Sequence, residues 1–172
     1  MVKHKLILMR HAKSDWSTAA QSDFDRPLAK RGRKDAPRMG RWLHEQGLFP
    51  DKFISSPARR TRETAESVAE KLLFPREDIF WERQLYEGSL HDLLAVIQAH
   101  SQDTGMLLMI AHNPGLDALV DYLARDTVRL TNTGKLMTTA AVAVLDFGAG
   151  PINTKPATAG LEYLVRPREL DD

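Results

Sequence analysis

Short apolar runs alternate along this chain with longer segments whose apolar residues fall at helical spacing, and this alternation constrains the fold more than any other feature. The sequence predicts strands at 5–9, 53–54, 79–81, 106–111, 140–147 and 161–165. It predicts helices at 30–46, 57–72, 89–99 and 114–123. Strands that alternate with helices of this length indicate a parallel sheet with helices on its faces. We therefore predict an α/β fold, a three-layer α/β/α sandwich with a largely parallel central sheet.

Several predicted helix ends carry capping signals. Ser56-Pro57 and Asn113-Pro114 each place a capping side chain before a proline that suits the first helical position. Ser89 is a third candidate cap, and Gly47 is well placed to end the first helix. Pro37 leaves the start or the straightness of that helix open. Residues 15–26 and 148–160 are predicted loops, of which the first is a candidate lid or rim.

Composition limits both size and location. A chain of 172 residues with 42% hydrophobic content suits one domain, which we expect to cover residues 1–172. A net charge of +1 gives no general reason to expect nucleic acid or a membrane surface as a partner. The absence of cysteine excludes disulfides and thiolate catalysis, and it is compatible with a reducing compartment. We expect a cytoplasmic protein without a signal peptide or a transmembrane segment.

The first predicted strand ends on two residues suited to phosphate chemistry. In LILMRHAKSDW, residues 6–16, the apolar run stops at Arg10 and His11. A neutral imidazole can attack phosphorus, and a guanidinium offers a planar fork of donors that matches phosphoryl oxygens. Alone, however, an Arg-His pair is common, and a histidine at a strand end is more often a structural hydrogen-bonding residue.

Two further segments supply more of the same chemistry. SSPARRTRETA at 55–65 contains Arg60, and IAHNPGL at 110–116 contains His112. Each segment follows a predicted strand, and open α/β sheets bind ligands beyond the carboxyl ends of their strands. Helices that begin at these segments would also point free N–H groups toward the same place, which favours an anion. Singly, these residues have ordinary interpretations as ion-pair or hydrogen-bonding residues, but together they favour a phosphate site.

The three blocks, with DRPL at 25–28, resemble the histidine phosphatase superfamily, and within it the small phosphohistidine phosphatase branch, SixA. The resemblance covers roughly residues 5–147. It implies a phosphoglycerate mutase-like fold, His11 as a nucleophile that carries a transient phosphoryl group, and no cofactor. It also implies that Arg10, Arg60 and His112 surround the phosphoryl oxygens. Arg60 is preferred over its arginine neighbours because the family pattern places its second arginine four residues after the serine.

The proton donor is the least defined part of the predicted site. Many members of the family use a carboxyl group, and Glu87 in LYEGS is the nearest candidate, although an exposed loop glutamate explains it equally well. Lys13, Ser14 and Asn113 are further candidates for contact with phosphate or substrate. We predict no metal site, because the remaining histidines form no metal-ligand pattern with carboxylates: His4, His44, His91 and His100.

Three functions remain open at this point. The leading hypothesis is a phosphohistidine phosphatase that acts on a histidine-phosphorylated phosphotransfer protein in signalling or a phosphorelay. The alternative is a small-molecule phosphomonoesterase of the same superfamily, acting on a sugar or nucleotide phosphate. A catalytically silent phosphate-binding module is the third. An imidazole is a much better leaving group than an alkoxide, so a doubtful general acid favours the first hypothesis.

Overall fold

The computed structural model describes residues 3–17, 20, 22–126 and 136–170 of the chain. Within them, six strands form one sheet in the order β3-β2-β4-β1-β5-β6. The strands β1 to β4 are parallel to one another, whereas β5 runs antiparallel to both β1 and β6. The prediction of a largely parallel sheet is therefore confirmed. The strand bounds are β1 Lys5–Arg10, β2 Lys52–Ser55, β3 Phe80–Trp81, β4 Met106–Ala111, β5 Val142–Asp146 and β6 Gly160–Val165.

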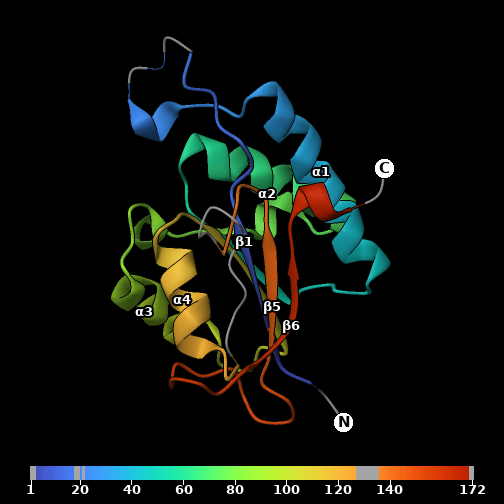
Figure 1. Cartoon of the computed structure of the whole chain (residues 1–172), viewed down its shortest axis with the longest axis vertical. Helices are drawn as coiled ribbons and strands as arrows, with labels where there is room; N and C mark the ends of the chain where they lie inside the picture. The colour runs from blue at the N-terminus through green and yellow to red at the C-terminus, as the bar shows by residue number, and fades with distance from the viewer. Residues whose placement is uncertain (1–2, 18–19, 21, 127–135, 171–172) are drawn as a thin grey trace.

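Helices cover both faces of this sheet, with α1 and α2 on one side and α3 and α4 on the other (Figure 1). The α-helix bounds are α1 Lys30–Glu45, α2 Arg59–Leu72, α3 Leu90–His100 and α4 Gly115–Leu123. Four short 3-10 turns are η1 Asp23–Asp25, η2 Arg76–Asp78, η3 Arg83–Leu85 and η4 Pro167–Glu169. This arrangement confirms the predicted three-layer α/β/α sandwich. None of the helices among the described residues is long and apolar enough to cross a membrane.

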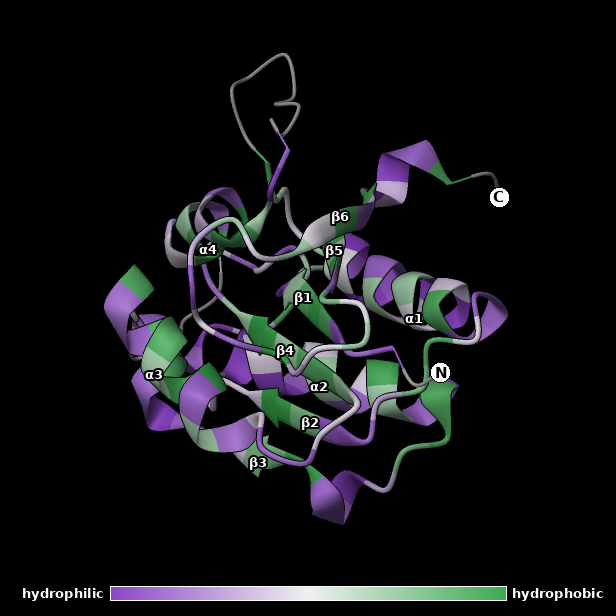
Figure 2. Cartoon of the chain, turned by 90° about the horizontal axis from the view of Figure 1, so that it is seen from below, coloured by the Kyte–Doolittle hydropathy of each residue, from purple (hydrophilic) through white to green (hydrophobic). Residues whose placement is uncertain are grey.

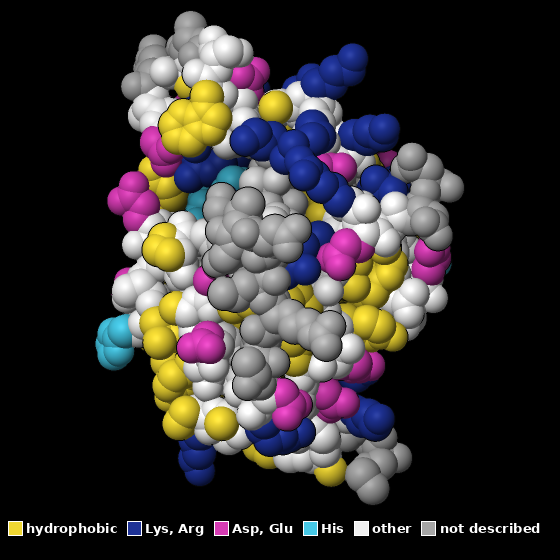
Figure 3. Space-filling view, in the orientation of Figure 1, with side chains coloured by type: hydrophobic (Ala, Val, Ile, Leu, Met, Phe, Trp, Pro, Cys, Tyr) yellow, Lys and Arg dark blue, Asp and Glu magenta, His cyan; other side chains and the backbone are white. Residues whose placement is uncertain are grey.

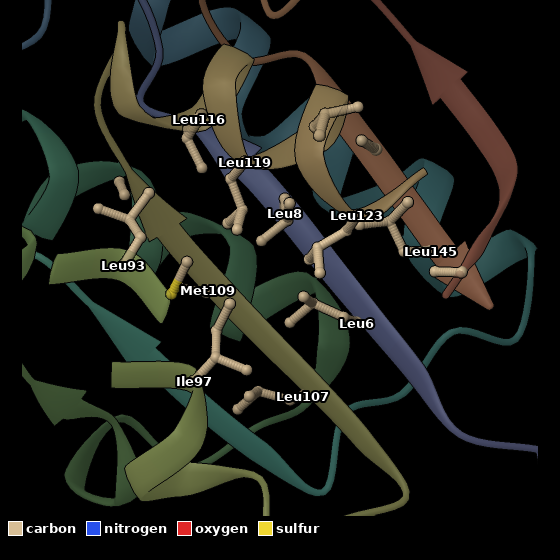
Figure 4. Close-up of a cluster of buried hydrophobic side chains, with 14 of the residues drawn as sticks. Leu6, Leu8, Leu93, Ile97, Leu107, Met109, Leu116, Leu119, Leu123 and Leu145 are labelled. Atoms are coloured by element: carbon tan, nitrogen blue, oxygen red, sulfur yellow. The ribbon is translucent and has the colours of Figure 1, made fainter. Parts of the chain in front are cut away.

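The alternation of side chains along β1 explains why this strand is apolar throughout. Leu6 and Leu8 pack with α3 and α4, whereas Ile7 and Met9 point to the other face and pack with α1 and α2. Figure 4 shows the first of these clusters, in which side chains of β1, β4 and β5 meet those of the two helices. In Figure 2 the strands β1, β2 and β4 are largely hydrophobic, whereas the helices around them mix hydrophobic and hydrophilic residues. A parallel strand buried on both faces needs such a continuous apolar run.

Helix α1 continues through Pro37 without a break. The proline removes one N–H donor from the helix, but buried side chains on both sides of it, including Ala36 and Met39, hold α1 against α2. Gly47 adopts the left-handed conformation, with φ of 69°, just after the helix ends, as the sequence predicts. Ser89 caps α3 as predicted, because its side chain accepts a hydrogen bond from the backbone N–H of Asp92.

Candidate active site

The carboxyl ends of β2, β4 and β1 lie side by side, because these neighbouring strands are parallel. Ser56, His112 and His11 follow the three strands directly and so emerge at one edge of the sheet. The rings of His11 and His112 lie 5.2 Å apart, measured between their centroids. In the space-filling view, Lys and Arg side chains gather around a partly visible histidine in the upper half of the molecule (Figure 3). Three separated sequence blocks thus meet in one place.

His11 is held in the protonation state that a nucleophile needs. Its side chain is buried, and Nδ1 lies 2.8 Å from the carbonyl oxygen of Ala12. Since a carbonyl oxygen can only accept, Nδ1 carries the hydrogen and Nε2 keeps its lone pair. Burial holds the pKa of His11 well below its usual value; His112 and the guanidinium groups of Arg60 and Arg10 lower it further, while the bond to Ala12 opposes them. The imidazole is therefore neutral at physiological pH.

His112 is fixed from both sides of its ring. Its Nδ1 lies 3.4 Å from a terminal nitrogen of Arg60, and its Nε2 lies 2.8 Å from Oγ of Ser56. A guanidinium can only donate, so Nδ1 accepts from Arg60 and Nε2 donates to Ser56. Burial and then the charge of Arg60 lower the pKa of His112 to about 3, against the opposing effect of Asp23. His112 is thus neutral as well, so neither imidazole carries a charge at the place where an anion would bind.

The two predicted arginines approach the histidines from different elements. Arg10 ends β1 and donates from a terminal nitrogen to the carbonyl oxygen of Met137 at 3.1 Å. Arg60 lies in the first turn of α2 and donates to the backbone carbonyl and the side chain of Asp23, at 2.8 and 3.1 Å. Among the described residues, the buried Nε atoms of both guanidinium groups have no acceptor. Two cations with unused donors lie beside two neutral imidazoles, which is an arrangement that suits a phosphoryl group.

Asn113 supports Arg10 instead of pointing a free amide at the site. Its Nδ2 donates to the same Met137 carbonyl that accepts from Arg10, and to the side chain of Asp117. Its Oδ1 accepts from the backbone N–H of Asp117, in the first turn of α4. The amide group of Asn113, which the sequence suggested for contact with phosphate, is therefore hydrogen-bonded within the protein.

Sequence reasoning missed a second group of residues around Asp23. The Asp23 side chain accepts hydrogen bonds from Arg60, from Nε of Arg26 at 3.0 Å and from the Tyr86 hydroxyl at 2.8 Å. Arg26 also donates to Oγ of Ser14 at 2.6 Å. The signal for Arg26 was present in the DRPL segment, which carried the family resemblance but no assigned role. Asp23 and Tyr86 lie 63 residues apart, and no pattern in the sequence links them.

The less certain predicted residues lie at different depths. Ser14 is buried and accepts a hydrogen bond from Arg26, so it lies beside the site and contacts it through that arginine. Lys13 is half-buried, and its backbone carbonyl accepts from the N–H of Ala29. Glu87 is exposed and has a left-handed φ of 56°. Glu87 affects the site through Tyr86, because burial, the bond to Asp23 and the neighbouring Glu87 carboxylate raise the pKa of Tyr86 to about 12.

The two predicted cap positions that border the site were wrong by two residues and by one residue. Helix α2 begins at Arg59, not at Pro57, because Oγ of Ser56 contacts His112 and accepts from the N–H of Ala58 ahead of the helix. Helix α4 begins at Gly115, with Pro114 as its cap, although Asn113 still accepts from an N–H of the first turn. Two side chains that were predicted to cap helices therefore serve the site as well.

This geometry defines a class of protein: an α/β sandwich whose parallel strands present a neutral, oriented imidazole to an anion held by guanidinium groups. Such an imidazole can attack phosphorus, while the arginines stabilise the charge on the transferred group. Within the described parts of the chain, no three His, Asp or Glu side chains are grouped so that they could hold a metal ion. Phosphoryl transfer through a histidine is the chemistry that the four side chains fit.

Comparison with known proteins supports the same class. Residues 6–93 match the model of the histidine phosphatase superfamily (branch 1), and the chain belongs to this superfamily. It is 27% identical over 162 residues to the phosphohistidine phosphatase SixA of Escherichia coli, which covers 92% of this chain and 96% of that protein. It is also 30% identical to an uncharacterised chloroplastic protein of Arabidopsis thaliana, over 75% of this chain and 63% of that protein.

The fold has a close counterpart among solved structures. The protein histidine phosphatase SixA, solved in complex with tungstate, superposes with a TM-score of 0.79 at 24% identity, covering 97% of this chain and 99% of that one. This confirms the phosphoglycerate mutase-like α/β fold that the sequence motifs implied. The superfamily and the likeness to SixA make the protein a hydrolase of the phosphatase type.

Proposed function

We propose that this protein removes the phosphoryl group from a phosphorylated histidine of another protein. In the first step, Nε2 of His11 forms a bond to phosphorus while the bond between phosphorus and the partner's imidazole nitrogen breaks. The partner's imidazole departs as a neutral ring when its second nitrogen carries a proton. In the second step, water attacks the phosphoryl group on His11, orthophosphate leaves, and the released proton passes to solvent. Arg10, Arg60 and His112 surround the transferred group in both steps.

The observation that carries this proposal is the state of Asp23, the carboxyl group that is bound to Arg60. An alkoxide leaving group needs a proton donor, whereas an imidazole does not. Burial favours the protonated form of Asp23, but the Tyr86 hydroxyl and the Arg60 and Arg26 guanidinium groups together hold its pKa below the usual value. Asp23 is thus a carboxylate that lacks a proton to donate at neutral pH. A site without a proton-donating Asp23 is matched to a substrate with a good leaving group.

A small-molecule phosphomonoesterase is the second candidate, and the placement of Glu87 favours it. This carboxyl group lies beside the Tyr86 hydroxyl, and the Tyr86 ring is 5.6 Å from the ring of His112, centroid to centroid. Tyr86 therefore links Glu87 to His112, and Glu87 is the carboxyl group that would protonate an ester oxygen in this second candidate. A silent phosphate-binding module is less well supported, since a neutral and oriented His11 is a requirement of chemistry rather than of anion binding.

The test measures loss of phosphate from a histidine-phosphorylated phosphotransfer protein and from a panel of sugar and nucleotide phosphates. The wild type is compared with His11→Ala and with a matched control, His91→Ala. The control removes an exposed histidine of α3 that has no assigned role in the site. We expect fast, His11-dependent loss from the protein and slow hydrolysis of the esters. Glu87→Gln should leave the protein reaction unchanged. Faster ester hydrolysis that Glu87→Gln abolishes would establish the second candidate instead.

The signalling partner and the cytoplasmic location belong to this proposal too. A phosphotransfer protein is the partner whose chemistry fits the leaving-group argument, and the lack of cysteine is compatible with a reducing compartment.

Binding of phosphate without any trapped phosphoryl group on His11 would instead favour the silent module.

A further inference from the structure

The orientation of His11 depends on the backbone of a single residue, Ala12. Its carbonyl oxygen accepts from Nδ1 of His11 at 2.8 Å, which leaves Nε2 free. Its own N–H donates to Oγ1 of Thr64 at 3.0 Å, and Ala12 and Thr64 are both fully buried. A buried N–H that loses its acceptor is costly, so the Thr64 hydroxyl determines where the Ala12 residue sits.

The same hydroxyl connects residues 11–13 after β1, here called the nucleophile loop, to the helix that carries Arg60. Oγ1 of Thr64 donates to the backbone carbonyl of Arg60 at 2.7 Å, one helical turn earlier. Because a hydroxyl has one hydrogen, that bond directs the hydrogen toward Arg60 and a lone pair toward the N–H of Ala12. A buried chain of contacts therefore runs from the backbone of Arg60 through Thr64 and Ala12 to the imidazole of His11.

We propose that Thr64 is a positioning residue that aligns the His11 imidazole with the turn of α2 that carries Arg60. The inference rests on the proposed role of His11 as the nucleophile. In-line attack requires Nε2 and the phosphate-holding groups to keep a fixed relation, and a misplacement of about 1 Å can cost on the order of 100-fold in rate. Thr64 touches neither the phosphoryl site nor Arg60's guanidinium in this scheme, so it acts through the backbones of Ala12 and Arg60.

The chain offers a matched control one turn away. Thr61 lies on the same helix, is also fully buried, and donates from Oγ1 to the backbone carbonyl of Ala58 at 2.7 Å. The hydroxyl of Thr61 serves the helix, whereas that of Thr64 also serves the nucleophile loop. Thr61→Val and Thr64→Val each remove one buried hydroxyl with nearly the same change of shape.

The experiment compares steady-state kinetics of Thr64→Val, Thr61→Val and Thr64→Ser, with the histidine-phosphorylated protein and with phosphoramidate as substrates. Thr64→Val should lower kcat by about 10- to 100-fold with KM changed by less than about threefold, since positioning affects attack more than binding. Thr61→Val should keep kcat within about twofold. Thr64→Ser retains the hydroxyl and should recover most of the lost rate.

A second readout needs no substrate: the nitrogen chemical shifts of the His11 ring report which nitrogen carries the hydrogen. We expect hydrogen on Nδ1 in the wild type and in Thr61→Val, and a mixture of tautomers in Thr64→Val. Unchanged ring shifts in a folded Thr64→Val protein overturn the inference, as does an equal loss of kcat in both valine variants. If the wild type hydrolyses neither substrate, the proposed function fails while the ring shifts still decide the role of Thr64. If Thr64→Val does not fold, Thr64→Ala and Thr64→Ser provide the same comparison.

Discussion

At the residue scale, the neutral His112 should make the protein less stable in acid. Its pKa in the folded state is lowered to about 3, from an ordinary value of about 6.5. Below pH 6.5 the unfolded chain therefore binds a proton that the folded chain does not, and the free energy of unfolding falls as the pH falls. Relative to His112→Gln, the wild type should lose about 2 kcal/mol between pH 7 and pH 5.

Urea unfolding of both proteins at several pH values measures this difference. Between pH 7 and pH 8, above the usual titration of histidine, the difference between the two proteins should stay constant and serves as the control. A parallel pH dependence of the two proteins from pH 7 to pH 5 would show that His112 accepts a proton in the folded state.

Asp23 should weaken anion binding at the site that it helps to build. Its carboxylate occupies the same guanidinium of Arg60 that a phosphoryl group would use. The Asp23 side chain is 44% exposed, so solvent screens its repulsion of an anion. We expect Asp23→Asn to tighten the inhibition constant of inorganic phosphate by roughly threefold to tenfold. Asp25→Asn, on the same turn, is the control, and weaker phosphate binding by Asp23→Asn would mean that the carboxylate mainly positions Arg60.

The positions of residues after strands drew attention to three of the four central side chains, and the family motifs were needed to select Arg60 and to assign a role to each. Arg10, His11 and His112 lie where parallel strands end, and strand ends are visible in the sequence. Arg60 lies in the first turn of α2, and only the family pattern distinguished it from its arginine neighbours. Tyr86 was not predicted because its contact with Asp23 depends on how two irregular segments fold over the site. Loop contacts of this kind have no periodicity that a sequence can display.

At the element scale, the close packing of the first turn of α1 against the nucleophile loop leads to a further prediction. A Cβ atom on Gly32 would lie 2.2 Å from the carbonyl oxygen of Lys13, two residues after His11. Gly32→Ala must therefore move the loop or the helix, and we expect a loss of about 2 kcal/mol in stability with a fall in kcat, despite the higher helix propensity of alanine. The measurements are urea unfolding and phosphatase kinetics.

Gly150→Ala provides the comparison, because a Cβ at that position would meet only one atom, at 3.9 Å. It should change stability by less than about 0.5 kcal/mol. If Gly32→Ala is as stable and active as the wild type, α1 does not constrain the nucleophile loop.

Helix periodicity was a better guide than helix ends. The periodic segments all became helices, and Ser89 caps α3 as expected. Ser56 and Asn113 each lie one or two residues ahead of the observed N-cap, and each has a tertiary partner, His112 for the first and Met137 for the second. Asn113 still accepts from an N–H of the first turn of α4 through its other amide atom, so the capping signal located the helix start only approximately.

At the scale of the whole molecule, alternation of strands and helices predicted three layers but not the direction of β5. The segment after α4 contains residues outside the described part of the chain, and β5 then enters the sheet antiparallel to β1. No helix connects β5 to β6, so the rule that links parallel strands to helical crossovers does not apply there. The parallel strands β1 to β4, which carry the candidate site, are the part of the sheet that the sequence pattern describes.

The surface beside the site should distinguish a protein substrate from a small one. Trp16 is 73% exposed, yet the Arg26 guanidinium lies 3.5 Å from its ring centre and joins it to the Asp23 group. A tryptophan held in place at the edge of a site suits contact with a protein surface. Trp16→Ala should lower kcat/KM about 10-fold for the phosphorylated protein and leave phosphoramidate hydrolysis unchanged. The control is Phe49→Ala, an exposed aromatic residue near the amino ends of the strands, which should change neither rate. Equal losses on both substrates would mean that Trp16 maintains Arg26 and does not contact a partner.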